Sequence, residues 1–138
     1  MKQVLQNILN GETNLVDVPC PKNIKSNILI ATRKTVVSIG TERMLVEFGK
    51  ASYISKAKLQ PDKVKMVLNK VITDGLMTTV DAVRSKLDQP LPLGYCNAGV
   101  VLESNVDGFE SGDRVVSNGN NAEVVRVPKN LCVKIPNN

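Results

Sequence analysis

The spacing of apolar residues changes twice along the chain, and this change most constrains the fold. Short valine- and isoleucine-rich runs occupy residues 1–37 and 90–138, whereas apolar residues in 42–89 recur at helical spacing. Short β-branched runs between turn residues predict strands, and apolar residues at i, i+3, i+4 and i+7 predict one face of a helix. The sequence therefore predicts an α+β chain, mainly β, in which a β-barrel or sandwich carries a helical insertion.

The first zone is expected to hold a hairpin and a longer strand. The runs KQVLQN (2–7) and TNLVDVP (13–19) flank the dipeptide Asn10-Gly11, which favours the left-handed backbone angles of a hairpin turn. The run NILIATRKTVV (27–37) is rich in β-branched residues, and such a run is typical of a largely buried strand.

The middle zone is expected to be helical. A helix start at residues 60–62 is indicated because Gln-Pro-Asp places proline in the first turn, where it is tolerated, and Gly75 can end that helix. A second helix is predicted to begin at Thr78, with Asp81 completing an imperfect capping box, and residues 42–58 are predicted to be helical too. The apolar positions of the first two of these helices are Val64, Val67, Leu68, Val71, Val80, Val83 and Leu87. We interpret these stripes as helices that pack onto a core.

The third zone returns to strands. The runs NAGVVLE (97–103), GDRVVS (112–117) and AEVVRVP (122–128) are short, valine-rich and separated by Gly, Asn and Asp. With the strands that precede the helical zone, they predict a β-rich scaffold on both sides of the insertion.

The charge pattern argues against nucleic acid as a partner. The formal net charge is +5, but the 18 Lys and Arg residues are scattered among 13 Asp and Glu. Binding to nucleic acid needs a contiguous basic surface, and single-strand binding adds stacked aromatic side chains. Because the chain has only two Tyr and two Phe, a dispersed, solvated charged surface is the expectation.

Cysteine and histidine usage limits the chemistry. Cys20, Cys96 and Cys132 are odd in number and widely spaced, which argues against a disulfide framework and favours a reducing compartment. The sequence has neither a signal-peptide core nor a stretch as long as a membrane span, so we expect a cytoplasmic chain without a membrane partner. Because histidine is absent, zinc would need Cys and carboxylate ligands, and no Ser-His-Asp or Cys-His nucleophile can form. Neither common glycine-rich phosphate loop occurs in the sequence.

Four phrases in a fixed order resemble a known family. They are GTER (40–43), PLPLGYCNAGVV (90–101), GDRVV (112–116) and AEVVRVPKNLCVKIP (122–136). Together they are similar to the GroES-like N-terminal domain of the medium-chain dehydrogenase/reductase family, which includes the zinc alcohol dehydrogenases. The resemblance implies a GroES-like, partly open β-barrel over residues 1–138, with a helical insertion over about 43–89.

The same resemblance implies that the chain is the substrate-side domain of an oxidoreductase. In the family a nucleotide-binding Rossmann domain follows this domain, and the Rossmann domain binds NAD or NADP. The 138 residues are therefore expected to be inert when isolated, to bind neither cofactor alone, and to need the C-terminal Rossmann domain of a longer parent as a partner. The implied substrate is a small alcohol or carbonyl compound, or a sugar nucleotide.

The residues at the family's zinc positions do not suit zinc. The first catalytic ligand in the family is a Cys, and Ile39 stands at that position; the second is a His, and Tyr95 stands there, followed by Cys96 in place of a Glu. The four-cysteine lobe that holds structural zinc has no counterpart. Because an alkyl side chain and a phenol cannot supply the N and S ligands that zinc prefers, the resemblance leads us to expect no metal.

Two hydroxyls are candidate catalytic residues, Thr41 and Tyr95. In the family a hydroxyl at the Thr41 position hydrogen-bonds the substrate oxygen and passes a proton, which suits a group that both donates and accepts; alternatively, Thr41 caps the following helix. The Tyr95 phenol would polarise a carbonyl or act as an acid; alternatively, it packs with its hydroxyl bonded nearby. Glu42 is expected to be a first-turn residue favoured by the helix dipole, and Cys96 a small buried side chain.

The long middle segment narrows the resemblance. The full phrase from GTERMLVEFGKAS to LDQPLPLGYCNAGVVLE resembles a bacterial subgroup of bi-domain oxidoreductases, in which the dehydrogenase half is joined to a unit of the Gfo/Idh/MocA type. That subgroup is associated with surface-polysaccharide or sugar-nucleotide metabolism, which implies a sugar-like substrate.

Two other functions stay open on the sequence. One is a metal-independent, quinone-reductase-like activity that uses NADPH. The other is a non-catalytic interaction module, in which the barrel is an inherited scaffold and the helical insertion forms a dimerisation or docking surface, because a fold does not fix a function. Homo-oligomerisation is compatible with each of these functions.

Overall fold

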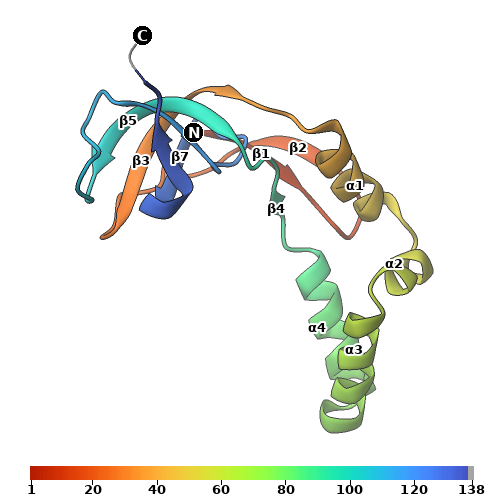
Figure 1. Cartoon of the computed structure of the whole chain (residues 1–138). Coiled ribbons are helices and arrows are strands. Elements are labelled where there is room, and N and C mark those ends of the chain that lie inside the picture. Colours follow the sequence, from red (N-terminus) through yellow and green to blue (C-terminus); the bar gives the residue numbers. More distant parts are fainter. Residues whose placement is uncertain (137–138) are drawn as a thin grey trace. The chain divides into compact units, whose positions relative to one another are not determined.

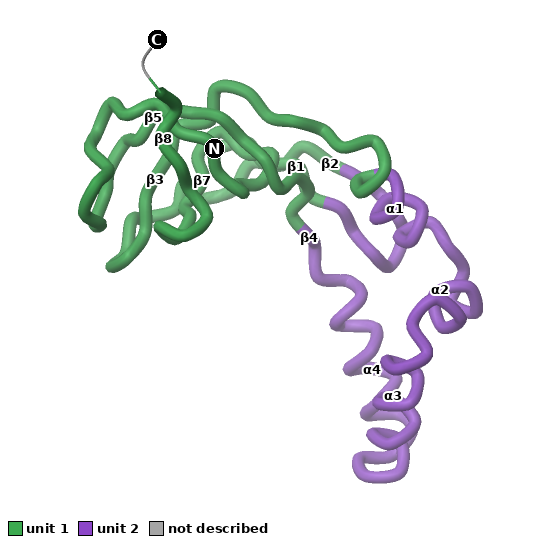
Figure 2. Tube along the Cα trace, viewed as in Figure 1, with its two compact units in different colours: residues 1–5, 14–42, 92–138 green, residues 6–13, 43–91 purple. Residues whose placement is uncertain are grey.

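The computed structural model describes residues 1–136, and the chain divides into two compact units (Figure 2). The strand unit consists of residues 1–5, 14–42 and the described residues from 92 onward, and the helical unit consists of residues 6–13 and 43–91. Strands dominate the first unit and helices dominate the second. The order of the elements confirms the predicted α+β fold, in which a helical insertion separates two β-rich zones.

A five-stranded antiparallel sheet forms the larger part of the strand unit (Figure 1). In their order across the sheet, its strands are β7 (Val124–Pro128), β3 (Asn27–Thr35), β5 (Asn97–Ser104), β6 (Arg114–Ser117) and β8 (Cys132–Lys134). A short 3-10 helix, Lys129–Leu131, connects β7 to β8. The valine-rich runs predicted to be strands are confirmed as β3, β5, β6 and β7.

A smaller sheet holds β1 (Lys2–Gln6) between β2 (Thr13–Asp17) and β4 (Leu91–Pro92). A single antiparallel bridge pairs Gln3 of β1 with Ala122, which lies shortly before β7. Within residues 1–136 the two sheets do not close into one barrel. This open arrangement agrees with the predicted, partly open GroES-like scaffold.

The predicted hairpin between β1 and β2 is present, but its turn is wider than the Asn10-Gly11 dipeptide indicated. Residues 7–12 form the loop, in which the Gly11 N–H donates to the Asn7 carbonyl at 2.9 Å. Gly11 has a left-handed φ of 75°, whereas Asn10 does not. The Asn7 side-chain oxygen accepts from the Asn10 N–H, so a side chain and not a second left-handed residue completes the turn.

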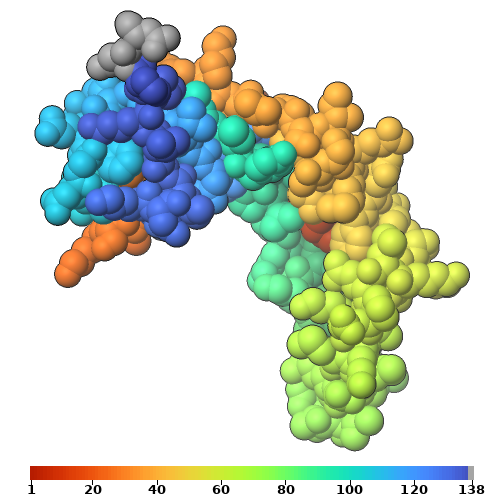
Figure 3. Space-filling model, viewed as in Figure 1, coloured from red at the N-terminus to blue at the C-terminus, as the bar shows by residue number. Residues whose placement is uncertain are grey.

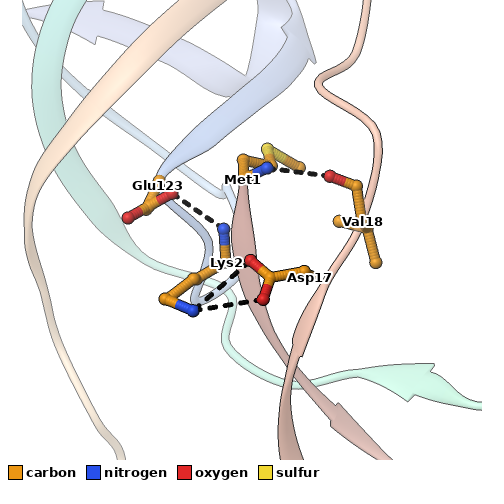
Figure 4. A network of polar contacts seen from close by, with 5 residues as sticks. All are labelled: Met1, Lys2, Asp17, Val18 and Glu123. Carbon is orange, nitrogen blue, oxygen red and sulfur yellow. Dashed lines mark hydrogen bonds and ion pairs between the residues drawn. The ribbon is translucent and has the colours of Figure 1, made fainter.

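Polar contacts hold the beginning of β1 (Figure 4). The Met1 amino group donates to the Val18 carbonyl at 2.8 Å, and the Lys2 backbone N–H donates to the Glu123 carboxylate at 2.8 Å. The Lys2 ammonium also lies 3.2 Å from the Asp17 carboxylate. Because these groups are exposed or half-buried, each contact contributes about 1 kcal/mol or less.

Aliphatic side chains form the core of the strand unit. The buried cluster consists of Ile28, Ile30, Val101, Val115, Ala122, Val125 and Val127. Ile28 and Ile30 come from β3, which confirms the buried strand predicted there. Burial of each Ile or Val contributes about 1.5–3 kcal/mol, so this cluster is the main source of stability in the unit.

Four helices follow one another along the middle of the chain. They are α1 (Ile39–Lys50), α2 (Tyr53–Leu59), α3 (Pro61–Asp74) and α4 (Leu76–Leu87). The predicted start at residues 60–62 and the predicted end at Gly75 are confirmed for α3. The helical segment expected over 42–58 is divided at Ser52, whose side-chain oxygen accepts from the Ser55 N–H and caps α2. Within residues 1–136, every helix is too short or too polar to span a lipid bilayer.

The predicted start of the last helix at Thr78 is wrong by two residues. Helix α4 begins at Leu76, directly after Gly75, and no side chain caps it. The hydroxyl of Thr79, one residue beyond Thr78, donates to the Gly75 carbonyl at 2.8 Å. The glycine that ends α3 therefore also begins α4, and the imperfect capping box has no role in the helix start.

The apolar stripes of α3 and α4 do not pack onto a core as we interpreted them. Their half-buried apolar residues are Val64, Val67, Val71, Val83 and Leu87, and they lie on two helices that pack against each other. Helix α3 has no buried residue, and Leu68 and Val80 from the predicted stripes are exposed. The stripes therefore form a two-helix hairpin with much of its apolar surface open.

Candidate functional site

The loop before β5 carries Tyr95, one of the two candidate catalytic residues. Gly94 precedes it with φ of 91°, and a Cβ atom at Gly94 would lie 2.6 Å from the backbone nitrogen of Asn121. The left-handed backbone and this close approach both require glycine at this position. The carbonyl of buried Leu93 accepts from the Asn121 N–H at 2.8 Å. These contacts fix the turn, while the Tyr95 side chain stays 45% exposed.

A buried polar network fixes the strand that follows the tyrosine turn. The amide of Asn97 donates to the Thr32 hydroxyl at 2.9 Å and accepts from the Ser117 hydroxyl at 2.6 Å. Two residues later, a Cβ atom at Gly99 would collide with the Ala31 carbonyl, so the close approach of the two backbones requires glycine. Because the buried amide is satisfied on both sides, it stabilises the strand pairs β3–β5 and β5–β6.

The second candidate, Thr41, lies in the first turn of α1 with its side chain exposed. Helix α1 begins two residues earlier, at Ile39, and the Ser38 hydroxyl accepts from the Thr41 backbone N–H at 3.5 Å. Ser38 therefore caps the helix, and the capping alternative for Thr41 is wrong. The two hydroxyls lie 3.4 Å apart, with Ser38 as donor, which leaves the Thr41 hydroxyl able to donate to a ligand.

Main-chain pairing connects the segments that carry the two candidates. The Val36 N–H, just after β3, donates at 3.0 Å to the carbonyl of Cys96, just before β5. Tyr95 directly precedes Cys96 in the chain. Helix α1, which carries Thr41, begins a few residues after Val36. In the described residues no hydrogen bond joins the side chains of Thr41 and Tyr95. The fold thus brings their segments together without placing the two hydroxyls in contact.

The side chains at the positions that resemble zinc-ligand positions of the dehydrogenase family offer no ligand set. Ile39 is an exposed hydrocarbon side chain, and Cys96 is half-buried with a free thiol. Glu42 occupies the first turn of α1, as predicted, and its Oε1 atom is buried without a hydrogen-bond partner. Within residues 1–136, no three Cys, Asp or Glu side chains converge as metal ligands would. The absence of zinc stays a prediction that rests on the chemistry of these side chains.

A cavity of about 460 Å³ lies in the strand unit beside β7. Asn118, Asn120 and Arg126 supply polar side chains to its lining, and Val18 and Leu131 are among the apolar ones. Neither candidate catalytic residue lines this cavity. It is therefore a separate feature of the strand unit and adds nothing to the candidate site.

Sequence reasoning missed a buried lysine in the helical unit. The side chain of Lys56, in α2, is enclosed, and its ammonium donates to the carbonyls of Ile8 at 2.7 Å and Gly49 at 2.8 Å. Desolvation by burial lowers its pKa below the ordinary value for lysine. Nothing in the sequence distinguishes it from Lys58, which is exposed. Because Lys56 bonds only main-chain carbonyls, we assign it a structural role, which joins the 7–12 loop to α1 and α2.

Two further pKa values are shifted in the strand unit. The pKa of Asp113, in the turn before β6, is lowered by a hydrogen bond from the Lys134 ammonium at 2.7 Å, and then by the Glu110 N–H at 2.7 Å. Burial raises the pKa of the Cys132 thiol. A thiol that stays protonated is a poor nucleophile, so Cys132 is a packing residue.

The chain is similar to solved oxidoreductase structures over nearly its whole length. A quinone oxidoreductase from Coxiella burnetii gives a TM-score of 0.61 at 20% identity, over 97% of this chain and 36% of that one. Galactitol-1-phosphate dehydrogenase from Escherichia coli gives 0.61 at 13% identity, over 99% and 38%. A quinone oxidoreductase from Thermus thermophilus, solved also in complex with NADPH, gives 0.56 at 18% identity, over 99% and 32%. Neither a protein-family model nor a curated protein matches the chain.

At these identities the likeness shows a shared fold and nothing finer. The shared fold confirms the α+β, GroES-like class that the sequence predicted. The chain spans only 32–38% of the length of these three structures. A fold does not fix a function, so activity, substrate and cofactor belong to the proposals that follow.

Proposed function

We propose that the chain is the substrate-side domain of an NAD(P)-dependent oxidoreductase. The proposal rests on how much of each chain the structural match covers. The match covers 97–99% of this chain but only 32–38% of each oxidoreductase. Such coverage supports a longer parent protein in which a second, nucleotide-binding Rossmann domain completes the enzyme. The isolated chain is then inert.

The described residues do not fit NAD(P). Dinucleotide sites use a parallel βαβ unit whose glycine-rich turn presents a helix N-terminus to the pyrophosphate. The strand pairs of the five-stranded sheet are antiparallel. Glycines with a left-handed backbone lie in separate turns, at Gly11, Gly75, Gly94, Gly108 and Gly112. We therefore assign cofactor binding, and the nicotinamide chemistry, to the remainder of the parent.

A titration of the 138-residue chain with NADPH tests this division of roles. We expect no saturable binding at up to about 100 μM cofactor in calorimetry or nicotinamide fluorescence. A two-domain quinone oxidoreductase is the positive control. Sub-micromolar affinity of the isolated chain would show that it carries a dinucleotide site of its own, and the proposed division would be wrong.

In the parent, Thr41 and Tyr95 are the proposed contacts to the substrate oxygen. Both side chains are exposed, and the Thr41 hydroxyl has a free donor while the Tyr95 phenol can polarise a carbonyl. No zinc takes part in this proposal, because Ile39 and Tyr95 offer no suitable ligand atoms at the family's metal positions.

Substitutions in the intact gene product test these two roles. Thr41→Val and Tyr95→Phe each remove a hydroxyl at nearly constant size, and we expect each to lower kcat/KM by about 10²–10⁴-fold. Thr13→Val and Tyr53→Phe are matched controls, because they remove exposed hydroxyls elsewhere and should leave the rate unchanged. Unchanged turnover in all four variants would favour the non-catalytic interaction module.

A quinone-reductase-like activity is the second candidate, because quinone oxidoreductases are among the structural neighbours. A quinone carbonyl needs no metal, so this activity also agrees with the side chains at the family's zinc positions. NADPH oxidation by the intact gene product, measured with a quinone and with a sugar aldehyde, separates the two candidates. The sugar-like substrate rests on the sequence resemblance alone, and a rate with quinone only would exclude it.

A further inference from the structure

The α3–α4 hairpin exposes apolar side chains along both of its helices. More than half of the side-chain surface is open at Met66, Leu68, Ile72, Leu76, Met77 and Val80. In the space-filling view these helices are the yellow-green part of the surface (Figure 3). Single exposed apolar residues are ordinary, but six of them on one helical hairpin are more than the surface of an isolated hairpin needs, and they are candidates for an interaction surface.

A groove between α3 and α4 includes Met66 from this group. Its volume is about 390 Å³, and its apolar floor consists of Met66, Val67, Val83 and Leu87. Met66 and Val67 lie one turn after Lys63, and Lys70 lies one turn further on the same face of α3. The groove thus has an apolar floor with cations at helical spacing beside it.

Lysines form the charged rim of the groove. Lys63 and Lys70 of α3 and Lys86 of α4 line it, and none of its described lining residues is acidic. Lys70 pairs with Asp74 at 2.6 Å, whereas Lys86 donates to the neutral side chain of Gln89 at 3.1 Å. In residues 1–136 no carboxylate lies within 4.0 Å of the Lys63 or Lys86 ammonium. Each helix therefore contributes one cation without an ion-pair partner to the lining of the groove.

We propose that this groove binds an acidic amphipathic helix of a partner protein. An apolar stripe at i, i+3 or i+4, and i+7 fits the floor, and carboxylates on both sides of the stripe reach Lys63 and Lys86. A second copy of the chain is the weaker occupant, because it would bring the same lysines together. A flat lipid surface does not enter a concave groove. The proposal is independent of the oxidoreductase function, because the groove is lined only by the helical unit.

A second hollow on the hairpin shows why charge selects the groove. This hollow is lined by Tyr53, Val67, Leu68, Val71, Leu76, Thr79, Val80, Val83 and Arg84. It is as apolar as the groove but carries one cation instead of three. An acidic helix therefore gains more from the groove, where attraction adds to burial.

Peptide binding to the whole 138-residue chain tests the proposal. The probe is a fluorescein-labelled helix of about 18 residues, with Leu along one stripe and Glu on both sides of it. A second peptide has the same composition in scrambled order, and a third has Lys in place of Glu. We expect saturable anisotropy with the probe, with Kd of about 1–50 μM, and at least tenfold weaker binding of the other two peptides.

Matched variants locate the binding surface. Lys63→Glu/Lys86→Glu should weaken binding of the probe at least about tenfold, whereas Lys58→Glu/Lys65→Glu makes the same charge change outside the groove and should alter it less than about twofold. Met66→Glu and Ile72→Glu are a second matched pair, at exposed apolar positions. Met66 lines the groove, whereas Ile72 does not. All four positions of the charge pairs and both apolar side chains are exposed, and circular dichroism confirms that each variant is folded.

Several results would overturn the proposal. Equal binding of the three peptides, or equal loss in the two double variants, would show that the groove does not select an acidic stripe. A dimer seen by sedimentation that Met66→Glu dissociates, with no probe binding, would assign the groove to a second copy. Binding to phosphatidylserine vesicles that Lys63→Glu/Lys86→Glu abolishes, again without probe binding, would assign the surface to a membrane.

Discussion

The strand unit buries apolar side chains of a kind that the helical unit leaves exposed. Ile30 of β3 is 0% exposed in the aliphatic cluster, whereas Ile72 of α3 is 85% exposed. Side chains from β3, β5, β6 and β7 meet in one cluster, whereas α3 and α4 pack mainly against each other, with α2 also in contact with α3. Apolar residues of the strand unit therefore stabilise the fold, whereas the exposed apolar residues of the hairpin are available to bind a partner.

Replacement of the two isoleucines is the strongest test of this comparison. Ile30→Ala leaves a cavity among close-packed neighbours and should lower the free energy of unfolding by about 2–5 kcal/mol. Ile72→Ala should change it by less than about 0.5 kcal/mol, because the side chain makes little contact. Urea denaturation followed by circular dichroism measures both values. Similar losses would mean that Ile72 is covered in solution, and the contrast between the units would fail.

The tyrosine turn is expected to show the next largest effect. Gly94→Ala adds a Cβ atom that meets Asn121 and forces a left-handed backbone on alanine, so we expect a loss of about 2–3 kcal/mol. Gly108→Ala is the matched control, because Gly108 has a similar φ of 89° but no atom within 4 Å of the added Cβ. Gly108→Ala should lower the free energy of unfolding by about 1–2 kcal/mol, because only the left-handed backbone is unfavourable for alanine there. If thermal unfolding gives equal losses, then the contact with Asn121 does not determine the turn.

In the helical unit the buried lysine gives a smaller effect. Lys56→Met keeps the length of the side chain but leaves the Ile8 and Gly49 carbonyls without their donor, so we expect a loss of about 1–3 kcal/mol. Lys58→Met, two residues away and exposed, should cost less than about 0.5 kcal/mol. Hydrogen exchange adds a local readout, because the amides of the 7–12 loop should exchange faster only in the Lys56 variant. Unchanged exchange would contradict the assigned role of Lys56.

The parts of the fold that the sequence predicts are those with strong local signals. Strands β3 and β5 follow from β-branched runs, and α3 follows from Pro61 at its start and Gly75 at its end. The predicted start of α4 is wrong because Gly75, and not the capping pattern at Thr78, determines where the helix begins. The core interpretation failed because periodicity identifies an apolar face and contains no information about what covers that face.

The candidate site depends on the sequence in a different way. Thr41 and Tyr95 come from the order of family phrases, and physical reasoning adds only that Gly94 and Gly99 need their close contacts. Ser38 as the cap of α1 was not predicted, because a serine one turn before Thr41 competes with it for the same role. Lys56 was not predictable either, since the carbonyl of Ile8, one of its partners, lies in a loop almost fifty residues earlier in the chain.

The smallest predicted effect concerns pH and the sheet edge in the strand unit. The folded pKa of Asp113 is lowered, chiefly by Lys134, so its contribution to stability is complete above the unfolded pKa of about 4 and is lost as the pH falls through the folded pKa. Asp113→Asn should therefore destabilise the chain slightly at pH 7 and not at a pH below the folded pKa, where the native carboxylate is protonated. Asp107→Asn, an exposed aspartate nearby in the sequence, is the control. Asparagine keeps an oxygen that can accept from the Glu110 N–H, so a loss that persists unchanged at low pH would indicate altered turn geometry rather than the lost attraction to Lys134.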